Sequence, residues 1–454
     1  MITHDRQSMH GQWSSRLTFV MAATGAAVGL GNIWKFPYLT GVHGGSAFVL
    51  AYMLCVAFLG IPMMMAEVML GRRGRQTPVN TMRTLAEETN AGQGWQLIGW
   101  SGTLAGILIL SYYSVIGGWT IGYIVHAAAG DFSGLSGDGA SSLFGDFVGS
   151  PLIQVGWHTT FMFITMFIVA RGVQSGLEKA VTYLMPALLV LLLVLVGYAM
   201  TTGYFMKGLV FLFTPDFTHF SRASMLTAMG QAFFSMSLGM GTIMVYGSYL
   251  PKGVSITGTS VAVALSDTMV ALIAGMAIFP IVFANALTPG AGPSLIFETI
   301  PVAFGHMAGG TLFGTLFFIL LLIAAWTSSI SLIEPAVTMM IEKFNMTRRA
   351  AAVWTGLVTW LLGLGTAFSF NVWADVKVLG LTFFEQIDFL TSNLMLPIGA
   401  IGMAVFAGWV MSKHMSREEL AMKSPINYFI WLTLIRVVAP IAVSIVLLHA
   451  VHVF

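Results

Sequence analysis

The chain has 454 residues, of which 57% are apolar and only 8% are charged. A typical soluble domain carries about 25% charged residues, so a soluble protein of this length could not cover its surface with so few charges. The composition predicts a polytopic membrane protein and excludes a soluble globular one, and the net charge of +2 gives no sign of a nucleic-acid partner. Cys55, the single cysteine, can form no intrachain disulfide.

Apolar runs of about 20 residues predict eleven membrane-spanning helices. The fourth run is short, whereas several others are long enough to indicate tilt or interruption of the helix. In chain order the predicted spans cover residues 17–39, 44–70, 97–127, 157–170, 180–202, 224–249, 257–285, 312–341, 350–370, 379–411 and 427–453.

The distribution of Lys and Arg predicts the orientation of these spans. With the amino terminus inside, fifteen of the twenty basic residues fall in cytoplasmic segments. The positive-inside rule therefore predicts a cytoplasmic amino terminus and, after eleven spans, an outside carboxyl terminus in the plasma membrane. Segment 128–156 contains three aspartates but no Lys or Arg, as expected of an exterior loop.

Two predicted spans, the first and the sixth, carry glycine and small polar residues at mid-membrane, in segments 24–32 and 231–241. An unpaired backbone group in hydrocarbon costs several kcal/mol, so a membrane helix is interrupted only where the freed groups line a cavity or bind a ligand. If five spans form a repeat, the first and sixth spans are the first helices of the two copies, so their interruptions occupy corresponding positions. Because a repeat of five spans crosses the membrane an odd number of times, the second copy inserts upside down relative to the first. We expect one transporter domain, 1–454, with repeats at about 13–202 and 222–411 and an extra helix at about 427–453.

The first interruption would offer both amide and carbonyl groups to a ligand. The N-terminus of a half-helix suits a carboxylate, whereas freed carbonyls suit a small cation, and Asn32 adds a side-chain oxygen. Gly25 and Gly29 would equally suit close helix packing, although packing needs no amide at position 32. The freed groups would be the amides near Leu30 and Gly31 and the carbonyls near Gly25, Ala27 and Val28.

The second interruption contains two hydroxyl groups, those of Ser235 and Ser237. Serines in membrane helices commonly bond to their own helix, which is the alternative here. Two serines within three residues, between Phe234 and Gly239, favour a binding site.

Asp267 is the strongest single candidate, because it falls in an otherwise apolar span. An intramembrane carboxylate is expensive to bury and is commonly functional. A structural hydrogen bond or a position at the membrane edge is the alternative. Glu67, near the end of the second span, better suits bonding between helices.

Thr327 and Ser328 place adjacent hydroxyl groups in the eighth span. With backbone carbonyls they could complete an oxygen cage, which suits a hard monovalent cation such as sodium, whereas transition metals prefer histidine or cysteine. The ten histidines show no metal-ligand spacing, and no nucleotide-binding motif is present. We therefore expect sodium ions and no organic cofactor.

Several short motifs follow one another in a specific order: Trp13-Ser-Ser-Arg-Leu17, Gly25 to Pro37, His43-Gly-Gly45, Gly60-Ile-Pro62 with Glu67, Tyr112-Tyr113, Gln231 to Gly241 and Thr327-Ser-Ser329. From residue 13 to about 390 they resemble the bacterial amino-acid transporter branch of the neurotransmitter:sodium symporter family. The resemblance implies an all-α membrane fold of eleven helices, a five-plus-five inverted repeat, and unwinding of helices 1 and 6 at mid-membrane.

The resemblance implies two sodium sites. The first would consist of the Ala27 carbonyl, the side chains of Asn32, Ser235 and Asp267, and the carboxylate of the substrate. The second would consist of the carbonyls of Gly25, Val28 and Ala324 and the hydroxyls of Thr327 and Ser328.

The resemblance also implies how an amino-acid substrate is held. Its carboxylate would meet the amides of Leu30 and Gly31 and the hydroxyl of Tyr113. Its ammonium would meet the carbonyls of Ala27, Phe234 and Ser235 and the hydroxyl of Ser237. Its side chain would lie among Ile109, Phe234, Met240, Ser328 and Leu332. An outer gate would pair Lys35 with Asp388, and an inner gate would pair His10 with Glu342.

Departures from the family's pattern bear on the substrate and on chloride. Amine-transporting relatives have an acid at the position of Gly29, so glycine favours a substrate that brings its own carboxylate. Asp267 stands where many relatives have asparagine, and Ala271 stands where others have a serine or glutamate tied to chloride. A fixed carboxylate could supply the negative charge that chloride supplies elsewhere, so we expect chloride-independent transport.

Both gates depart from the family's pattern as well. His10 stands at the position of the usual inner-gate arginine, which weakens the bridge to Glu342 and leaves Arg6 as an alternative partner. Lys35 replaces a common arginine at the outer gate and lacks its bidentate fork.

The sequence therefore predicts a transporter and not an enzyme. We expect a sodium-coupled importer of neutral, hydrophobic or aromatic L-amino acids that works by alternating access, surrounded by membrane lipid and without an obligatory protein partner. Two alternatives stay open. Asp267 could titrate, which would allow proton coupling, and a non-transporting amino-acid sensor could use the same fold.

Overall fold

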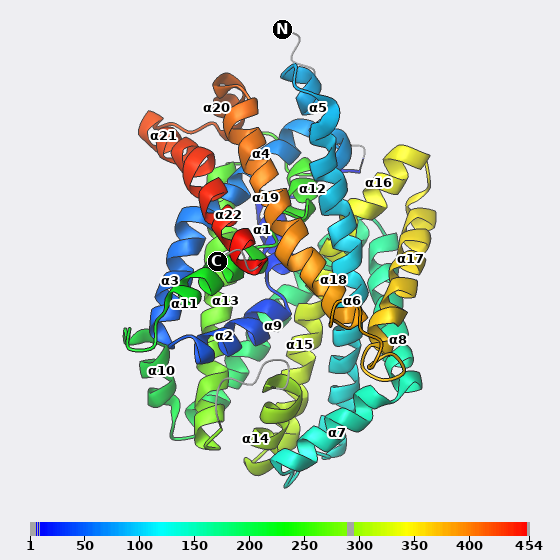
Figure 1. The fold of residues 1–454 in the computed structure, drawn as a ribbon, viewed down its shortest axis with the longest axis vertical. Helices are drawn as coiled ribbons and strands as arrows, with labels where there is room; N and C mark the ends of the chain where they lie inside the picture. The colour runs from blue at the N-terminus through cyan, green and yellow to red at the C-terminus, as the bar shows by residue number, and fades with distance from the viewer. Residues whose placement is uncertain (1–5, 7, 9, 288–294, 452–454) are drawn as a thin grey trace.

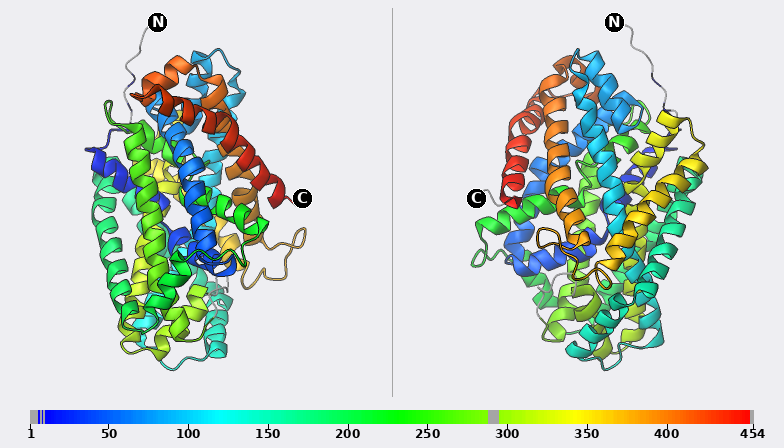
Figure 2. Two further views of the ribbon diagram at one scale, coloured as in Figure 1. Left: turned by 90° about the vertical axis from the view of Figure 1, so that its left-hand side faces the viewer. Right: turned by 45° about the vertical axis from the view of Figure 1, so that its right-hand side comes forward.

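The structure, a computed structural model, describes residues 6, 8, 10–287 and 295–451. Within this part of the chain the regular elements are helices, apart from one isolated β-bridge between Val378 and Leu381. Long helices form an elongated bundle (Figures 1 and 2). The predicted all-α fold is confirmed.

Among the described residues, nine helices are long and apolar enough to cross a membrane, and one bent pair of helices makes a tenth span. The helix of the predicted fourth span begins at Pro151, earlier than the predicted residue 157, because proline suits the first turn of a helix. The nine single spans contain α3 (Ser46–Cys55) with α4 (Ile61–Gly74), α6 (Gln96–Ala129), α8 (Pro151–Ala170), α9 (Lys179–Met200), α13 (Ile256–Ala284), α15 (Gly310–Leu332) with α16 (Glu334–Phe344), α17 (Arg348–Phe368), α18 (Phe383–Asp388) with α19 (Leu396–Val405), and α21 (Pro425–Thr433) with α22 (Ala439–Ala450).

The predicted sixth span is not one long helix. It consists of α11 (Arg222–Ser235) and α12 (Thr242–Ser248), and neither is long enough to cross a membrane alone. By length and apolarity the described chain therefore has up to ten spans, and the predicted count of eleven is not confirmed.

Shorter helices cover both ends of the bundle (Figure 1). At one end lie α5 (Pro78–Glu88) and α20 (Lys413–Leu420), which belong to segments predicted to be cytoplasmic. At the opposite end lie α7 (Gly137–Gly149), from the segment predicted to be exterior, and α14 (Ile300–His306). The predicted sides of the membrane thus fall at opposite ends of the molecule.

The first span is broken where the sequence predicts. The helix α1 (Arg16–Ala27) ends in extended backbone at Val28, and the chain resumes in a π-helical turn, η1 (Gly31–Lys35), that leads into α2 (Phe36–Val42). The two halves are bent by 57°. The interruption lies inside segment 24–32 but is shorter than it.

The second interruption, residues 236–241, separates α11 from α12. Ser237, Gly239 and Gly241 have φ values of 54°, 85° and 76°. Glycine adopts this left-handed region freely, whereas serine adopts it only under strain. A strained non-glycine residue in a membrane span is a feature of functional sites, where surrounding contacts hold it in place.

Glu67 on α4 holds the second interruption in position. Its fully buried carboxylate accepts the Gly239 N–H at 2.7 Å, which is the bonding between elements that the sequence suggests. We expect Glu67→Ala to lower the free energy of unfolding by about 2 kcal/mol, because a buried donor without a partner costs about 1–3 kcal/mol. Glu67→Gln keeps an acceptor oxygen and should be much milder in thermal unfolding. Equal losses in the two variants would contradict the role of the Gly239 bond.

Candidate functional site

Four buried polar side chains from η1, α3, α11 and α13 meet beside the first interruption. Asn32 Nδ2 donates to Asp267 Oδ1 at 2.8 Å and to the Asp267 carbonyl at 3.1 Å. The Tyr52 hydroxyl donates to Asp267 Oδ2 at 3.2 Å and lies 3.0 Å from the Ser235 hydroxyl. The structure therefore brings together the three side chains predicted for the first sodium site, and it adds Tyr52.

Sequence reasoning misses Tyr52, because a tyrosine within the apolar run of α3 looks like an ordinary core aromatic. Its ring does pack on Phe36, with ring centres 5.0 Å apart. The only signal is the phenol itself, since a buried tyrosine hydroxyl usually needs a partner. Gln231 is missed for a similar reason, although its Nε2 donates to the Gly31 carbonyl at 3.1 Å and so ties α11 to η1.

A second cluster joins α15 to the end of α1. The Ser328 hydroxyl lies 3.3, 3.4 and 3.2 Å from the carbonyl oxygens of Gly25, Ala26 and Val28. The Thr327 hydroxyl donates to the Ala324 carbonyl at 3.0 Å. A Cβ on Gly25 would lie only 3.3 Å from Thr327 Cβ, so glycine permits this approach. These oxygens come from hydroxyls and carbonyls, a donor set that suits sodium.

Tyr113 on α6 lies at the start of η1, between the two clusters. Its hydroxyl accepts the Leu30 N–H at 3.1 Å. A Cβ on Gly29 would lie 2.8 Å from that hydroxyl and 2.5 Å from the Ser328 hydroxyl. The space that the sequence assigns to a substrate beside Gly29 is thus taken by the protein's own hydroxyl groups in this conformation.

The remaining predicted substrate residues are partly engaged with one another. Ser237 donates its hydroxyl to the Ala26 carbonyl at 2.8 Å, and Phe234 lies over Gly31, whose Cβ would be 3.2 Å from its ring. Two glycines on α6, the helix of Ile109, allow close approach of neighbouring backbone. A Cβ on Gly102 would lie 2.9 Å from the Met240 carbonyl, and a Cβ on Gly106 would lie 2.4 Å from the Leu332 carbonyl oxygen. The residues placed in this buried region are Ala27, Ile109, Met240 and Leu332.

The predicted outer gate contains a cation on an aromatic ring. Lys35 Nζ lies 4.3 Å from the centre of the Phe234 ring, a favourable cation–π distance. The Asp388 carboxylate accepts the Ser392 hydroxyl at 2.9 Å. Lys35 therefore contacts a predicted substrate residue, whereas among the described residues it forms no ion pair with Asp388, so the predicted outer-gate pair stays a prediction.

The predicted inner gate is formed by His10 and Glu342. His10 Nε2 lies 2.9 Å from Glu342 Oε1. Glu342 also accepts the Thr77 N–H at 3.0 Å and the Asn80 amide at 2.6 Å. Arg6 pairs with Glu88 instead, so the alternative in which Arg6 takes the place of His10 is wrong.

We expect Glu342→Ala to loosen the amino-terminal turn of α5 far more than His10→Ala. Glu342 accepts the Thr77 N–H directly, whereas the loss of His10 leaves the bonds to Thr77 and Asn80 intact. Hydrogen–deuterium exchange over residues 77–80 should therefore rise about tenfold or more in the first variant and only slightly in the second, because each lost hydrogen bond is worth about 1 kcal/mol. Arg6→Ala is the control and should leave this exchange unchanged. Similar exchange in the His10 and Glu342 variants would contradict this assignment.

Comparison with known proteins identifies the family of this chain. The chain matches the Sodium:neurotransmitter symporter family over residues 10–133 and 148–454. It is 38% identical to the uncharacterized sodium-dependent transporter YhdH of Bacillus subtilis (strain 168), over 97% of each chain. It is 34% identical to an uncharacterized sodium-dependent transporter of Haemophilus influenzae, over 98% of this chain and 99% of that one.

A solved structure agrees with the sequence comparison. The fold is similar to that of MhsT in complex with L-phenylalanine, with a TM-score of 0.89 and 41% identity over 97% of this chain and 99% of MhsT. The family and the curated relatives are sodium-dependent transporters and not enzymes. This multi-pass membrane protein therefore belongs to the sodium:neurotransmitter symporter family.

Proposed function

We propose that this protein is a sodium-coupled importer of neutral, hydrophobic or aromatic L-amino acids that works by alternating access in the plasma membrane. The observation that carries the proposal is that a backbone amide, which suits a carboxylate, and side-chain oxygens, which suit a sodium ion, lie at the same helix break. Leu30 presents its N–H to the Tyr113 hydroxyl, and two residues later Asn32 bonds to Asp267. A substrate carboxylate at Leu30 could therefore also ligate a sodium ion beside Asn32.

Two sodium ions are the proposed co-transported cargo. One would lie among Asn32, Ser235 and Asp267, and the other among Thr327, Ser328 and the carbonyls at the end of α1. Direct contact between the first ion and the substrate would make each raise the other's affinity by the same factor, which is thermodynamic coupling.

We propose that the transporter is specific for substrates with a hydrophobic side chain. Four of the five residues of the predicted pocket are apolar, the exception being Ser328, and Met240 supplies a flexible, polarizable wall. Gly29 has no side chain, and a Cβ there would lie 2.5 Å from the Ser328 hydroxyl. This position therefore offers no carboxylate of the protein in place of the carboxylate of the substrate. L-phenylalanine, the ligand of the similar MhsT structure, is the first substrate to test.

Chloride independence is the finer part of the proposal. The Asp267 carboxylate lies fully buried between Asn32 and Tyr52, and in its ionised form it would supply fixed negative charge beside the first proposed ion. Ala271, one helical turn further along α13, is also fully buried and brings no polar side chain. A bound chloride would add a second negative charge to this closed environment.

Uptake into proteoliposomes tests the function. Purified protein should accumulate labelled L-phenylalanine when an inward sodium gradient is imposed, and replacing sodium by choline should abolish accumulation. Replacing chloride by gluconate should leave the rate unchanged. Competition by each of the twenty amino acids should favour large apolar side chains.

Each alternative predicts a different result in the same vesicles. Equal uptake driven by a pH gradient in sodium-free buffer would support proton coupling and contradict the proposal. Ligand binding without accumulation would support a sensor.

A further inference from the structure

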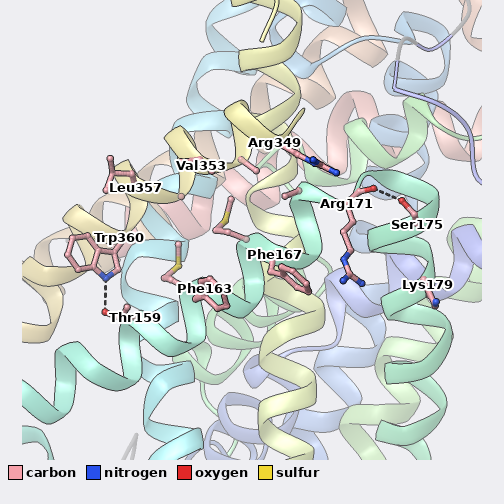
Figure 3. Close-up of a pocket in the computed structure, with 15 residues that line it drawn as sticks. Thr159, Phe163, Phe167, Arg171, Ser175, Lys179, Arg349, Val353, Leu357 and Trp360 are labelled. Carbon is pink, nitrogen blue, oxygen red and sulfur yellow. Dashed lines mark hydrogen bonds between the residues drawn. The ribbon is translucent and has the colours of Figure 1, made fainter. Parts of the chain in front are cut away.

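A groove of about 1080 Å³ opens on the outer face of the bundle, and none of the site residues described above lines it. It runs between α8 and α17, which lie side by side, and reaches the start of α9 (Figure 3). Phe163 and Val353 in its walls are 71% and 66% exposed, although both belong to membrane spans. The groove therefore faces lipid.

The walls of this groove are fixed to each other by specific contacts. The Arg348 guanidinium donates to both Glu334 oxygens at 2.8 and 2.6 Å and to the Val169 carbonyl at 2.8 Å, which ties the start of α17 to the end of α8. At the other end, Trp360 Nε1 donates to the Thr159 hydroxyl at 2.9 Å. The groove is therefore a built feature, bonded at both ends.

One end of the groove is basic. Arg171, Lys179 and Arg349 line it and are exposed (Figure 3). In the described part of the chain, no acidic side chain forms an ion pair with these three residues. The nearby acids are engaged elsewhere, because Glu334 binds Arg348 and Glu178 accepts from Ser14. Three positive charges thus remain available to a ligand.

The length and polarity of the groove match one leaflet of a bilayer. Arg349 and Trp360 are eleven residues apart on α17, which corresponds to about 16 Å of helix. One leaflet contributes about 15 Å of hydrocarbon. Beyond the basic end, the lining side chains are mostly apolar and include Phe163, Met166 and Trp360. A ligand that fits has an anionic head and a hydrocarbon chain.

We propose that this groove binds an anionic phospholipid of the cytoplasmic leaflet. The lipid phosphate would lie at Arg171, Lys179 and Arg349, and an acyl chain would follow the groove toward Trp360. The positive-inside distribution of the chain puts this basic end on the cytoplasmic side, and anionic lipids attract basic residues there. A second copy of this chain is a poorer occupant, because it would have to bring acidic groups to meet the three cations.

Native mass spectrometry of the purified transporter with added dioleoyl-phosphatidylglycerol tests the proposal. The variant R171Q/K179Q/R349Q should bind this lipid on the order of a hundredfold more weakly, since each basic side chain contributes roughly fivefold. The matched control R83Q/K413Q/K423Q removes three exposed basic residues from other segments predicted to be cytoplasmic and should bind as the parent does. Equal weakening in the two triple variants would reduce the effect to general charge and overturn the site.

A second variant tests the hydrocarbon part. Val353→Trp fills the groove wall from an exposed position without changing charge, so it should weaken lipid binding while thermal unfolding stays close to that of the parent. Dioleoyl-phosphatidylcholine should bind the parent much more weakly than the anionic lipid, and free glycerol phosphate should not compete. Equal binding of the two lipids, equal competition by glycerol phosphate, or a protein dimer that Val353→Trp dissociates would each overturn the proposal.

Discussion

Replacing Asp267 by asparagine is expected to raise the sodium concentration for half-maximal uptake by about tenfold to a hundredfold in chloride-free buffer. The carboxylate accepts hydrogen bonds from Asn32 and Tyr52 in a fully buried place, and bonds to a charged group are worth about 1.5–3 kcal/mol each. The neutral amide brings no negative charge to the first proposed sodium ion. Chloride should therefore restore part of the lost affinity in the variant while leaving the parent unaffected.

Tyr52→Phe is the matched control for this experiment. It removes the hydroxyl that lies between Ser235 and Asp267 but keeps the carboxylate charge. We expect a smaller rise in the sodium requirement and no response to chloride. Unchanged sodium affinity in the Asp267 variant, together with no chloride effect, would refute the role given to Asp267.

Ser328→Ala is expected to raise the sodium requirement about tenfold and to lower the maximal rate of uptake. The Ser328 hydroxyl lies within hydrogen-bond distance of three carbonyl oxygens at the end of α1, so its loss removes one proposed ligand and loosens the others. A tenfold change corresponds to about 1.4 kcal/mol, which is the usual contribution of one such group. Uptake of L-phenylalanine measured over a range of sodium concentrations gives both the sodium requirement and the maximal rate.

The next residue in the chain supplies the control. Ser329 is buried like Ser328, with exposed fractions of 0% and 6%, but its hydroxyl donates at 2.7 Å to the Ala325 carbonyl of its own helix. Ser329→Ala should therefore leave the sodium dependence close to that of the parent. If both serine variants lose sodium affinity equally, the effect is one of helix packing and not of ligation.

The fold could be predicted from the sequence because the lengths of apolar runs and the positions of glycine reflect the bilayer directly. Segment 24–32 breaks as predicted, since glycine and asparagine at mid-membrane have few other uses. The number of spans was harder to predict, because residues 222–248 form one largely apolar run that the predicted interruption at 231–241 divides into two short helices. The five-plus-five repeat stays a prediction.

The candidate site could be predicted only in part. Asp267 is conspicuous in an apolar span, yet nothing in residue spacing reveals that it meets Asn32, which is 235 positions away; the family resemblance supplied that pairing. Tyr52 and Gln231 stayed hidden because their residue types are common in helix packing. The assignments of substrate and sodium residues stay predictions for the transport experiments.

The 57° bend after Ala27 lets α1 act as a lever with its pivot at the proposed ligand site. Its twelve residues extend about 18 Å, so a rotation of about 10° at the break moves the far end by about 3 Å. At that end Trp13 holds the chain through bonds of 3.1 Å to the carbonyls of Tyr246 and Tyr249. A displacement of about 3 Å would lengthen both bonds beyond hydrogen-bond distance, so a small rotation at the break would free the chain at the far end of α1.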